Sequence, residues 1–278
     1  LQDSEAVLAV VDALSSPTVA ELKSSCPALR LCIGVDAGSG DVGFDALPQK
    51  DVEEWSLHPS LAHDPAVLIY TSGTTGNPKG VLYQHRSTVL HAMAEIAPAI
   101  FDLSPQAVLL PIVPMFHAAS WGLPFAGAAA GVKFMFSTTN DAATLHSLML
   151  QEGVTHSAGV PTVWLAMFAH LDAEAAAGRD ASLGKLRLVT IGGSAAPRAM
   201  IERLMKSGVR VAHAWGMTET SPIGTMGARA PNWDDLTLDE QIDVVCKQGR
   251  TPFGVELRVI DKDGNVAPRD GVTSGALQ

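Results

Sequence analysis

The chain has few cysteines and few charges, and each shortage excludes a class of protein. Its 278 residues include only three cysteines, Cys26, Cys32 and Cys246, and no two of them form a CxxC pair. This count and spacing do not predict a disulfide framework, so a reducing cytoplasm is the expected location. Charged residues make up 17% of the chain and hydrophobic residues 47%, a composition that excludes intrinsic disorder.

Positive charge is scarce as well. The chain has 19 Lys and Arg against 29 Asp and Glu, which gives a formal net charge of −10. A broad basic surface for nucleic acid is therefore not expected, and an anionic ligand has to be held by local donors.

Long hydrophobic runs are also rare. One stretch, 107–132, contains no Asp, Glu, Lys or Arg and has the length of a membrane span, about 20 residues. Three prolines interrupt it, so we predict a buried strand at Val108–Val113, a loop, a packed helix and a second strand at Val132–Phe136. No signal peptide or transmembrane segment is predicted, whereas peripheral membrane association and a homodimer stay open.

Strand-like runs alternate with helical runs along the chain. Strands are predicted at 66–70, 80–83, 186–191 and 209–213, and helices at 142–151, from Ser87, from Pro161 through Leu165 and Leu171, and from Pro197 to Gly208. This alternation predicts an α/β fold with a mainly parallel sheet covered on both faces. From about Gly249 the pattern changes, and Val255–Ile260, the turn 263–265 and Val266 predict a β-hairpin at the start of an antiparallel β unit.

The most specific motif follows the first of these strands, at Tyr70–Val81 (YTSGTTGNPKGV). A loop rich in hydroxyls, glycines and backbone N–H groups, with Lys79 at its end, can surround phosphate oxygens. It differs from the P-loop of NTPases, because Lys79 precedes Gly80 instead of following a glycine. The alternative is an ordinary exposed turn with many Ser and Thr residues.

Two further motifs follow strand ends. Gly192 and Gly193 form a turn between a strand and a helix, a position where α/β proteins often bind ligands. In the segment 213–220, Trp215 offers a flat face for a purine, Thr218 a hydroxyl, and Glu219 an oxygen ligand suited to Mg²⁺. Taken singly, these residues are equally typical of a tight connection, a buried Trp and a capping Thr.

A fourth region runs from Pro114 through His117 to Trp121. An isolated His in an apolar stretch is most often a core residue. The apolar residues around it, and those of 157–161, suit either a protein core or the walls of an apolar pocket.

In their order along the chain, the four regions resemble the motifs of the adenylate-forming superfamily of acyl-CoA synthetases, luciferases and peptide-synthetase adenylation domains. The resemblance extends from about residue 60 to the end of the chain, and it is closest to medium- or long-chain fatty acyl-CoA ligases. It implies ATP, Mg²⁺, coenzyme A and a fatty acid as ligands. The family commonly has Tyr where this chain has Trp215.

The resemblance also assigns site residues. The phosphates are expected at Thr71, Ser72, Gly73, Thr74, Thr75, Gly76 and Lys79. The rest of the nucleotide is expected at Gly193, Ser194, Ala195, His213, Ala214, Trp215, Gly216, Met217 and Thr218. The acid is expected beside His117, Trp121 and Gly192, with Glu219 as the Mg²⁺ ligand. Thr218, Glu219 and Lys79 are the expected catalytic residues.

The implied organisation is two α/β subdomains, both incomplete, followed by the start of a β-rich unit. Residues 1–103 belong to the first subdomain with its phosphate loop, 104–228 to the second with the adenine and acyl sites, and 229–278 to the β-rich unit. Family members continue with an Asp for the ribose, a hinge and a mobile domain with a catalytic Lys, none of which we find here. Because the chain begins with Leu1 and has no polar tail, we expect a fragment that is incompetent alone.

Other functions stay open at this point. One is an adenylating enzyme for an aryl or amino acid, or a luciferase-like oxidase. Another is a non-catalytic nucleotide-binding module.

Overall fold

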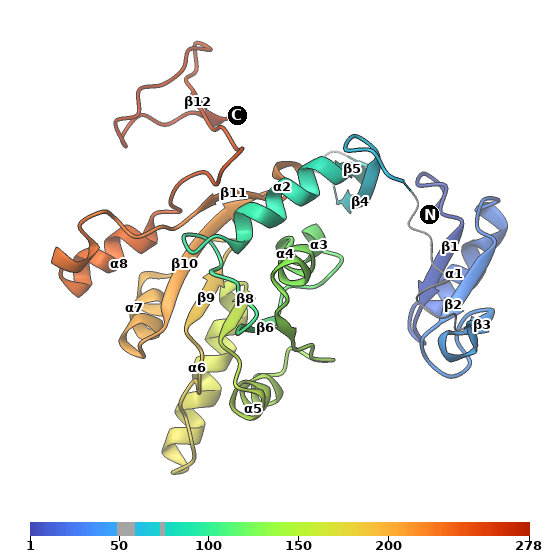
Figure 1. Cartoon of the computed structure of the whole chain (residues 1–278), viewed down its shortest axis with the longest axis horizontal. Helices are drawn as coiled ribbons and strands as arrows, with labels where there is room; N and C mark the ends of the chain where they lie inside the picture. The colour runs from blue at the N-terminus through green and yellow to red at the C-terminus, as the bar shows by residue number, and fades with distance from the viewer. Residues whose placement is uncertain (49–58, 73–75) are drawn as a thin grey trace. The chain divides into compact units, whose positions relative to one another are not determined.

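The computed structural model describes residues 1–48, 59–72 and 76–278, and it divides into two compact units, 1–61 and 62–278 (Figure 1). In the first unit, β1 (Leu8–Val11), β2 (Leu31–Gly34) and β3 (Val42–Gly43) form a parallel sheet in that order. The helical segments are α1 (Ser16–Leu22), η1 (Lys23–Ser25) and η2 (Phe44–Ala46). The predicted subdomain boundaries at 103/104 and 228/229 both fall within the second unit and remain predictions.

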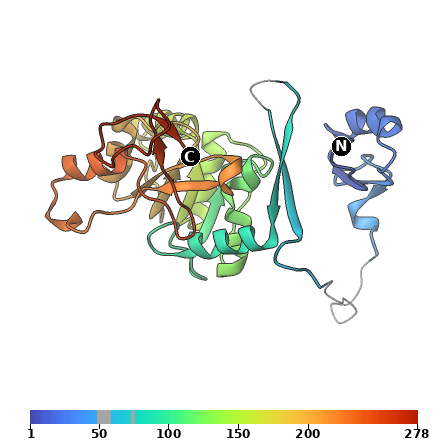
Figure 2. The ribbon, with the colours of Figure 1, turned by 90° about the horizontal axis from the view of Figure 1, so that it is seen from above.

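The second unit begins with an antiparallel hairpin. Strands β4 (Pro65–Thr71) and β5 (Lys79–Gln84) pair along their length, from Pro65 opposite Gln84 to Thr71 opposite Lys79. The predicted phosphate loop connects them, and in Figure 2 the hairpin is seen as a long two-stranded ribbon. Helix α2 (His85–Ile96) follows β5 directly.

A six-stranded sheet forms the centre of the second unit, in the order β11-β10-β9-β8-β6-β7. All neighbours are parallel except β10 and β11. The strands are β6 (Val108–Pro111), β7 (Lys133–Phe134), β8 (His156–Gly159), β9 (Leu188–Ile191), β10 (Arg210–Gly216) and β11 (Ile223–Met226). The predicted mainly parallel sheet is confirmed.

Helices cover both faces of this sheet, because its strands bury successive side chains on opposite sides. Val189 and Ile191 of β9 belong to one core, while Leu188 belongs to the other. On the first face pack α5 (Ala142–Glu152), α6 (Pro161–Ala176), α7 (Arg198–Lys206) and α8 (Leu238–Cys246). On the second face pack α2, α3 (Ala118–Trp121) and α4 (Leu123–Ala130).

The apolar run 107–132 therefore folds as β6, α3 and α4, with β7 beginning just after it, in line with the predicted strand, loop, helix and strand. Within the described ranges, no helix is long and apolar enough to cross a membrane.

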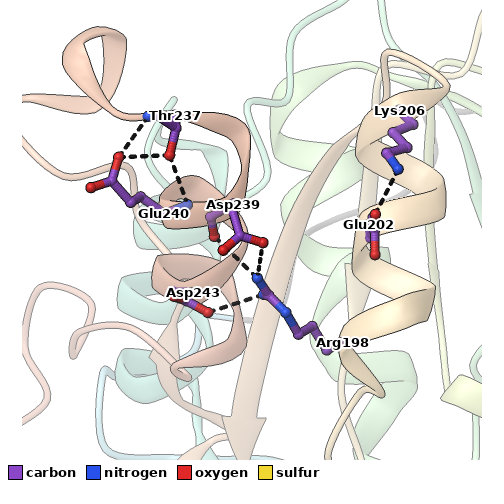
Figure 3. A network of polar contacts seen from close by, with 7 residues as sticks. All are labelled: Arg198, Glu202, Lys206, Thr237, Asp239, Glu240 and Asp243. Carbon is purple, nitrogen blue, oxygen red and sulfur yellow. Dashed lines mark hydrogen bonds and ion pairs between the residues drawn. The ribbon is translucent and has the colours of Figure 1, made fainter.

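Helix α8 is fixed to α7 by a polar network (Figure 3). Arg198 at the start of α7 pairs with Asp239 and with Asp243, the latter at 3.0 Å between Nη1 and Oδ1. At the start of α8, Thr237 donates its N–H to Oε2 of Glu240 at 2.8 Å, and Oγ1 of Thr237 accepts the N–H of Glu240. This capping box satisfies backbone groups that the first turn of a helix leaves unpaired.

One sequence prediction needs correction. The predicted hairpin around 263–265 is reduced to a turn with a single bridge, Ile260 to Val266, and the partner of β12 (Val259–Ile260) is β13 (Ala276–Leu277). The predicted helix from Pro161 through Leu165 and Leu171 is α6, in which Leu165 is 53% exposed. The buried side of that helix carries Trp164, Met167, Phe168 and Leu171.

Two 3₁₀ segments complete the second unit. One is η4 (Thr218–Thr220), within the third motif, and the other is η5 (Trp233–Asp235), before α8.

Candidate active site

A cavity of about 160 Å³ opens at the carboxyl ends of the parallel strands, beside the last residues of β9 and β10. This is the position where open α/β sheets usually bind ligands, because successive connections diverge there. Its lining consists of His117, Ala118, Trp121, Gly192, Gly193, Ala214, Trp215, Gly216, Met217, Thr218, Pro222 and Ile223. Three of the four sequence motifs therefore meet in one place.

Trp215 is held in the cavity wall by a glycine on the neighbouring strand. The Trp215 ring lies so close to Gly224 of β11 that a Cβ at residue 224 would be 2.3 Å from Cζ3. No side chain fits at that distance, so Gly224 sets the depth at which the indole sits. Trp215 is part-buried and lines the cavity, while its stacking against a purine remains a prediction.

Trp121 lies on a left-handed turn. Ala118, Ala119, Ser120 and Trp121 all have positive φ, between 49° and 57°, and Gly122 follows at 80°. Such a conformation costs roughly 1–2 kcal/mol for each non-glycine residue, so tertiary contacts must hold it. One of them is the buried hydroxyl of Ser120, which donates to the carbonyl of Val113 at 2.7 Å.

Thr218 is tied to the phosphate hairpin by a tyrosine that the sequence analysis did not assign. The hydroxyl of Tyr83, in β5, donates to the backbone oxygen of Thr218 at 2.5 Å. Burial and the negative charge of Glu219 raise the pKa of Tyr83 to about 12, so this hydroxyl stays protonated. The hairpin, the third motif and the cavity are thereby connected through one hydrogen bond.

The turn that presents Glu219 is closed by Thr220. Its Oγ1 accepts the N–H of Met217 at 2.9 Å and donates back to the carbonyl oxygen of the same residue. The carboxylate of Glu219 is exposed, and its charge acts on Tyr83. Glu219 is therefore close enough to Tyr83 for its charge to act on the contact between the hairpin and Thr218.

A single exposed carboxylate is a suitable protein ligand for Mg²⁺. This ion usually keeps several waters and binds one or two carboxylates together with the phosphates of a substrate. No group of three or more His, Cys, Asp or Glu residues suited to a metal lies within the described part of the chain. Glu219 thus fits Mg²⁺ that arrives with a nucleotide, rather than a metal held by the protein alone.

Lys79 begins β5 and stands four residues before Tyr83. Residues four apart in a strand share a side, and they are about 13 Å apart along it. Lys79 therefore faces the same side as the Tyr83–Thr218 contact but lies farther out along the hairpin, where the tail of a triphosphate could reach.

The other residues predicted for the phosphate loop surround this position. Thr71 ends β4, while Ser72 and Gly76 are exposed, and Gly76 has a φ of 145°. Gly73, Thr74 and Thr75 lie outside the described residues.

His213 does not line the cavity. Its side chain is 2% exposed, its Nε2 accepts the N–H of Ala196 at 3.2 Å, and its Nδ1 lies 3.2 Å from the carbonyl oxygen of Cys246. Both ring nitrogens are therefore engaged by backbone groups. Ser194 and Ala195 are exposed on the turn that Ala196 continues. The geometry makes His213 a support for that turn, and direct contact of His213, Ser194 and Ala195 with a nucleotide remains a prediction.

A larger cavity, of about 710 Å³, lies at the opposite, amino ends of β9 and β10. Arg187, Arg210 and Trp233 are among its lining residues, and none of the residues predicted for the site is there. Cavity size alone therefore does not identify the candidate site. The sequence motifs converge on the smaller cavity, and that convergence selects it.

Tyr83, Ala118, Pro222 and Ile223 were not predicted as site residues. Tyr83 is one of only two tyrosines in the chain and directly follows the phosphate loop in β5, a signal that could have identified it. Pro222 and Ile223 reach the cavity through the turn after Thr220, and no sequence motif predicts that contact.

The fold and the cavity define an α/β protein with a small-molecule site at the carboxyl ends of its strands. The family described as AMP-binding enzyme matches residues 1–277, and the chain belongs to this family.

Relatives and solved structures agree with this family. The chain is 37% identical to a medium-chain-fatty-acid–CoA ligase from Ectopseudomonas oleovorans over 287 residues, which is 100% of this chain and 52% of the relative. It is 44% identical to a 3-methylmercaptopropionyl-CoA ligase from Ruegeria lacuscaerulensis over 212 residues, 76% of this chain and 38% of the relative. The chain thus spans about half or less of the length of these relatives.

The fold is also that of a solved structure, the inhibitor-bound N-terminal domain of FACL13 from Mycobacterium tuberculosis. The TM-score is 0.77 at 24% identity, covering 96% of this chain and 62% of that one. At this identity the likeness establishes the fold.

Proposed function

We propose that the natural protein activates a fatty acid with ATP to an acyl-adenylate and then transfers the acyl group to coenzyme A. The observation that carries the proposal is the meeting of His117, Trp121, Trp215 and Thr218 in one cavity, with Tyr83 connecting it to the phosphate hairpin. Membership of the family and the two CoA-ligase relatives support the same reaction.

The first step forms a bond between a carboxylate oxygen and the α-phosphorus of ATP, while the bond to pyrophosphate breaks. A carboxylate is already ionised at neutral pH, so no general base is needed. The protein then acts by positioning and by stabilising charge. Lys79 and the loop before it bind the β- and γ-phosphates, and Thr218 lies at the α-phosphate.

Glu219 holds Mg²⁺ in this proposal. When bound, the ion neutralises phosphate charge and helps to orient the leaving group. The exposure of the Glu219 carboxylate and its electrostatic effect on Tyr83, which bonds to Thr218, support this role.

The second step breaks the mixed anhydride. The thiol of coenzyme A attacks the acyl carbonyl and displaces AMP. The relatives named as CoA ligases support coenzyme A as the acceptor, and the three free cysteines suit a reducing cytoplasm as the location.

The lining of the cavity supports a simple carboxylic acid rather than an amino acid. None of the described lining residues is Asp or Glu, so no carboxylate is available there to bind an α-ammonium group. Trp121 and Ile223 instead offer apolar surface for an acyl chain. We propose a medium- or long-chain fatty acid, while the 3-methylmercaptopropionyl-CoA ligase relative makes a short thioether acid the main competitor.

Carboxylate-dependent ATP–pyrophosphate exchange by the natural full-length protein tests the proposal. The panel of acids is acetate, 3-methylmercaptopropionate, octanoate, palmitate, benzoate and several amino acids. Exchange driven by octanoate or palmitate supports the proposal. Exchange driven only by another acid overturns the substrate, and binding of AMP without any exchange points to a non-catalytic module.

A further inference from the structure

A glutamate and a histidine lie buried together behind the cavity. Both belong to α2, one turn apart, and the side chains of His91 and Glu95 are 7% and 1% exposed. Nδ1 of His91 lies 3.4 Å from Oε2 of Glu95. Neither residue is part of the sequence motifs, and neither lines the cavity itself.

His91 holds one wall of the cavity. Its Nε2 accepts the backbone N–H of Ile223 at 3.2 Å, and Ile223 is a lining residue. An Nε2 that accepts is unprotonated, so the neutral ring carries its proton on Nδ1, which faces Glu95. Glu95 thereby selects the tautomer in which His91 can hold Ile223.

The same pair lies against the backbone beside Trp121, another residue of the cavity lining. A Cβ on Gly122 would be 2.7 Å from Oε2 of Glu95 and 2.9 Å from Nδ1 of His91. Gly122 is the residue after Trp121 and ends the left-handed turn. The pair is therefore in close contact with the backbone that carries Trp121, and that backbone has an unfavourable conformation unless its surroundings fix it.

The carboxyl of Glu95 is placed at a cost to the fold. Apart from the 3.4 Å contact of Oε2 with His91, neither oxygen has a hydrogen-bond partner in the described part of the chain. Burial raises the pKa of Glu95 to about 7, and the hydrogen bond and charge of His91 only partly oppose that rise. A residue whose only purpose is stability is better served by an apolar side chain at such a position.

We propose that Glu95 and His91 are positioning residues that fix the two walls of the cavity against each other, Trp121 through Gly122 and Ile223 through its N–H. The chemical class of ligand that depends on them is the acyl-adenylate, because Trp121 and Ile223 line the cavity in which the proposed function places it. This inference rests on the proposed function.

The test compares two affinities of the natural full-length protein. One is for a non-hydrolysable acyl-adenylate mimic, the octanoyl sulfamate of adenosine, and the other is for ATP. Glu95→Leu and His91→Leu should weaken binding of the mimic about tenfold or more, since small displacements of a site wall have effects of that size. ATP is held mainly through its phosphates, so its affinity should change about twofold or less.

Two variants separate positioning from stability. Glu95→Gln retains an acceptor for the His91 N–H and should bind the mimic almost as well as the unmodified protein. His146→Gln alters another buried histidine, 4% exposed and bonded to the carbonyl of Ser182 at 2.8 Å, away from the cavity lining. It should lower thermal stability and leave both affinities unchanged.

The proposal is overturned if Glu95→Leu and His91→Leu lower thermal stability but bind the mimic normally. It is also overturned if Glu95→Gln is as defective as Glu95→Leu. Failure of the unmodified protein to bind the mimic is a different result, because it overturns the proposed function instead.

Nitrogen-15 spectra of the histidine rings provide a measurement that does not depend on how the leucine variants fold. In the unmodified protein, His91 should show a protonated Nδ1 and a bare Nε2 at neutral pH, with signals assigned by their loss in His91→Gln. The opposite tautomer would leave Ile223 without its acceptor and overturn the proposal.

Discussion

At the scale of single residues, the contact between Gly224 and Trp215 makes a direct prediction. Gly224→Ala places a methyl group 2.3 Å from Cζ3 of Trp215, so the indole has to move out of the cavity wall. We expect the affinity for AMP or ATP to fall by roughly tenfold, because base–aromatic stacking contributes about 1–3 kcal/mol. Isothermal titration calorimetry measures this change.

Gly43→Ala is the matched control for that substitution. Gly43 has a φ of −71°, and no atom lies within 4 Å of a Cβ built there. The affinity of the Gly43→Ala variant for AMP or ATP should stay unchanged. Equal affinities for the two variants would show that the position of Trp215 does not matter to the nucleotide.

Tyr83 makes a second prediction at this scale. Tyr83→Phe leaves the carbonyl of Thr218 without its donor and loosens the contact between hairpin and cavity. We expect kcat/KM for pyrophosphate exchange to fall by roughly tenfold, the size expected when a partly buried acceptor loses its partner. If kcat/KM is unchanged, the hydrogen bond does not align the phosphates with the acid.

At the scale of elements, helix α8 depends on its cap. Thr237→Ala removes the side chain that accepts the Glu240 N–H and binds the Glu240 carboxylate. The free energy of unfolding should decrease by about 1 kcal/mol. Thr237→Ser keeps the hydroxyl, so its free energy of unfolding should decrease much less. Denaturant unfolding distinguishes the two variants.

Helices and strands were predicted well where the pattern of apolar residues was long and periodic. Helix α5 occupies 142–152 against a predicted 142–151, since its apolar residues recur at the helical period and Asp141 caps its start. The partner of β12 was missed because pairing with Ala276–Leu277 is a long-range contact.

At the scale of the whole molecule, a buried histidine should make stability depend on pH. Burial, and next the charge of Arg187, lower the pKa of His156 from 6.5 to about 4. Between these values the unfolded chain binds more protons than the folded protein, so the free energy of unfolding falls as pH falls through that window. The loss attributable to His156 is roughly 3 kcal/mol once the pH is below both pKa values.

His156→Gln tests this, because glutamine does not titrate. Its free energy of unfolding should fall less than that of the unmodified protein as pH is lowered through the window. His63→Gln, which alters an exposed histidine, is the control and should follow the unmodified protein. Parallel curves for all three proteins would show that His156 carries no such penalty.

The sequence predicted many of the residues that line the candidate site, but it did not predict how their side chains are arranged. Trp215, Thr218, Gly192, His117 and Trp121 were chosen from motifs, and the structure gathers them around one cavity. His213 was chosen from the same string, yet it points to the backbone of Ala196 and Cys246 instead. A motif specifies which residues are present, while the direction of each side chain depends on the strand that carries it.

By itself, the sequence determined the alternation of strands and helices, the covered parallel sheet and the family resemblance, because these follow from local hydrophobic period and contiguous motifs. Only the tertiary structure decided three contacts. The Tyr83 hydroxyl bonds to the backbone of Thr218, Gly224 packs against the ring of Trp215, and His91 and Glu95 pack against Gly122. Those contacts join residues that belong to different elements of the chain. No local pattern encodes them, since they depend on how the sheet brings distant segments together.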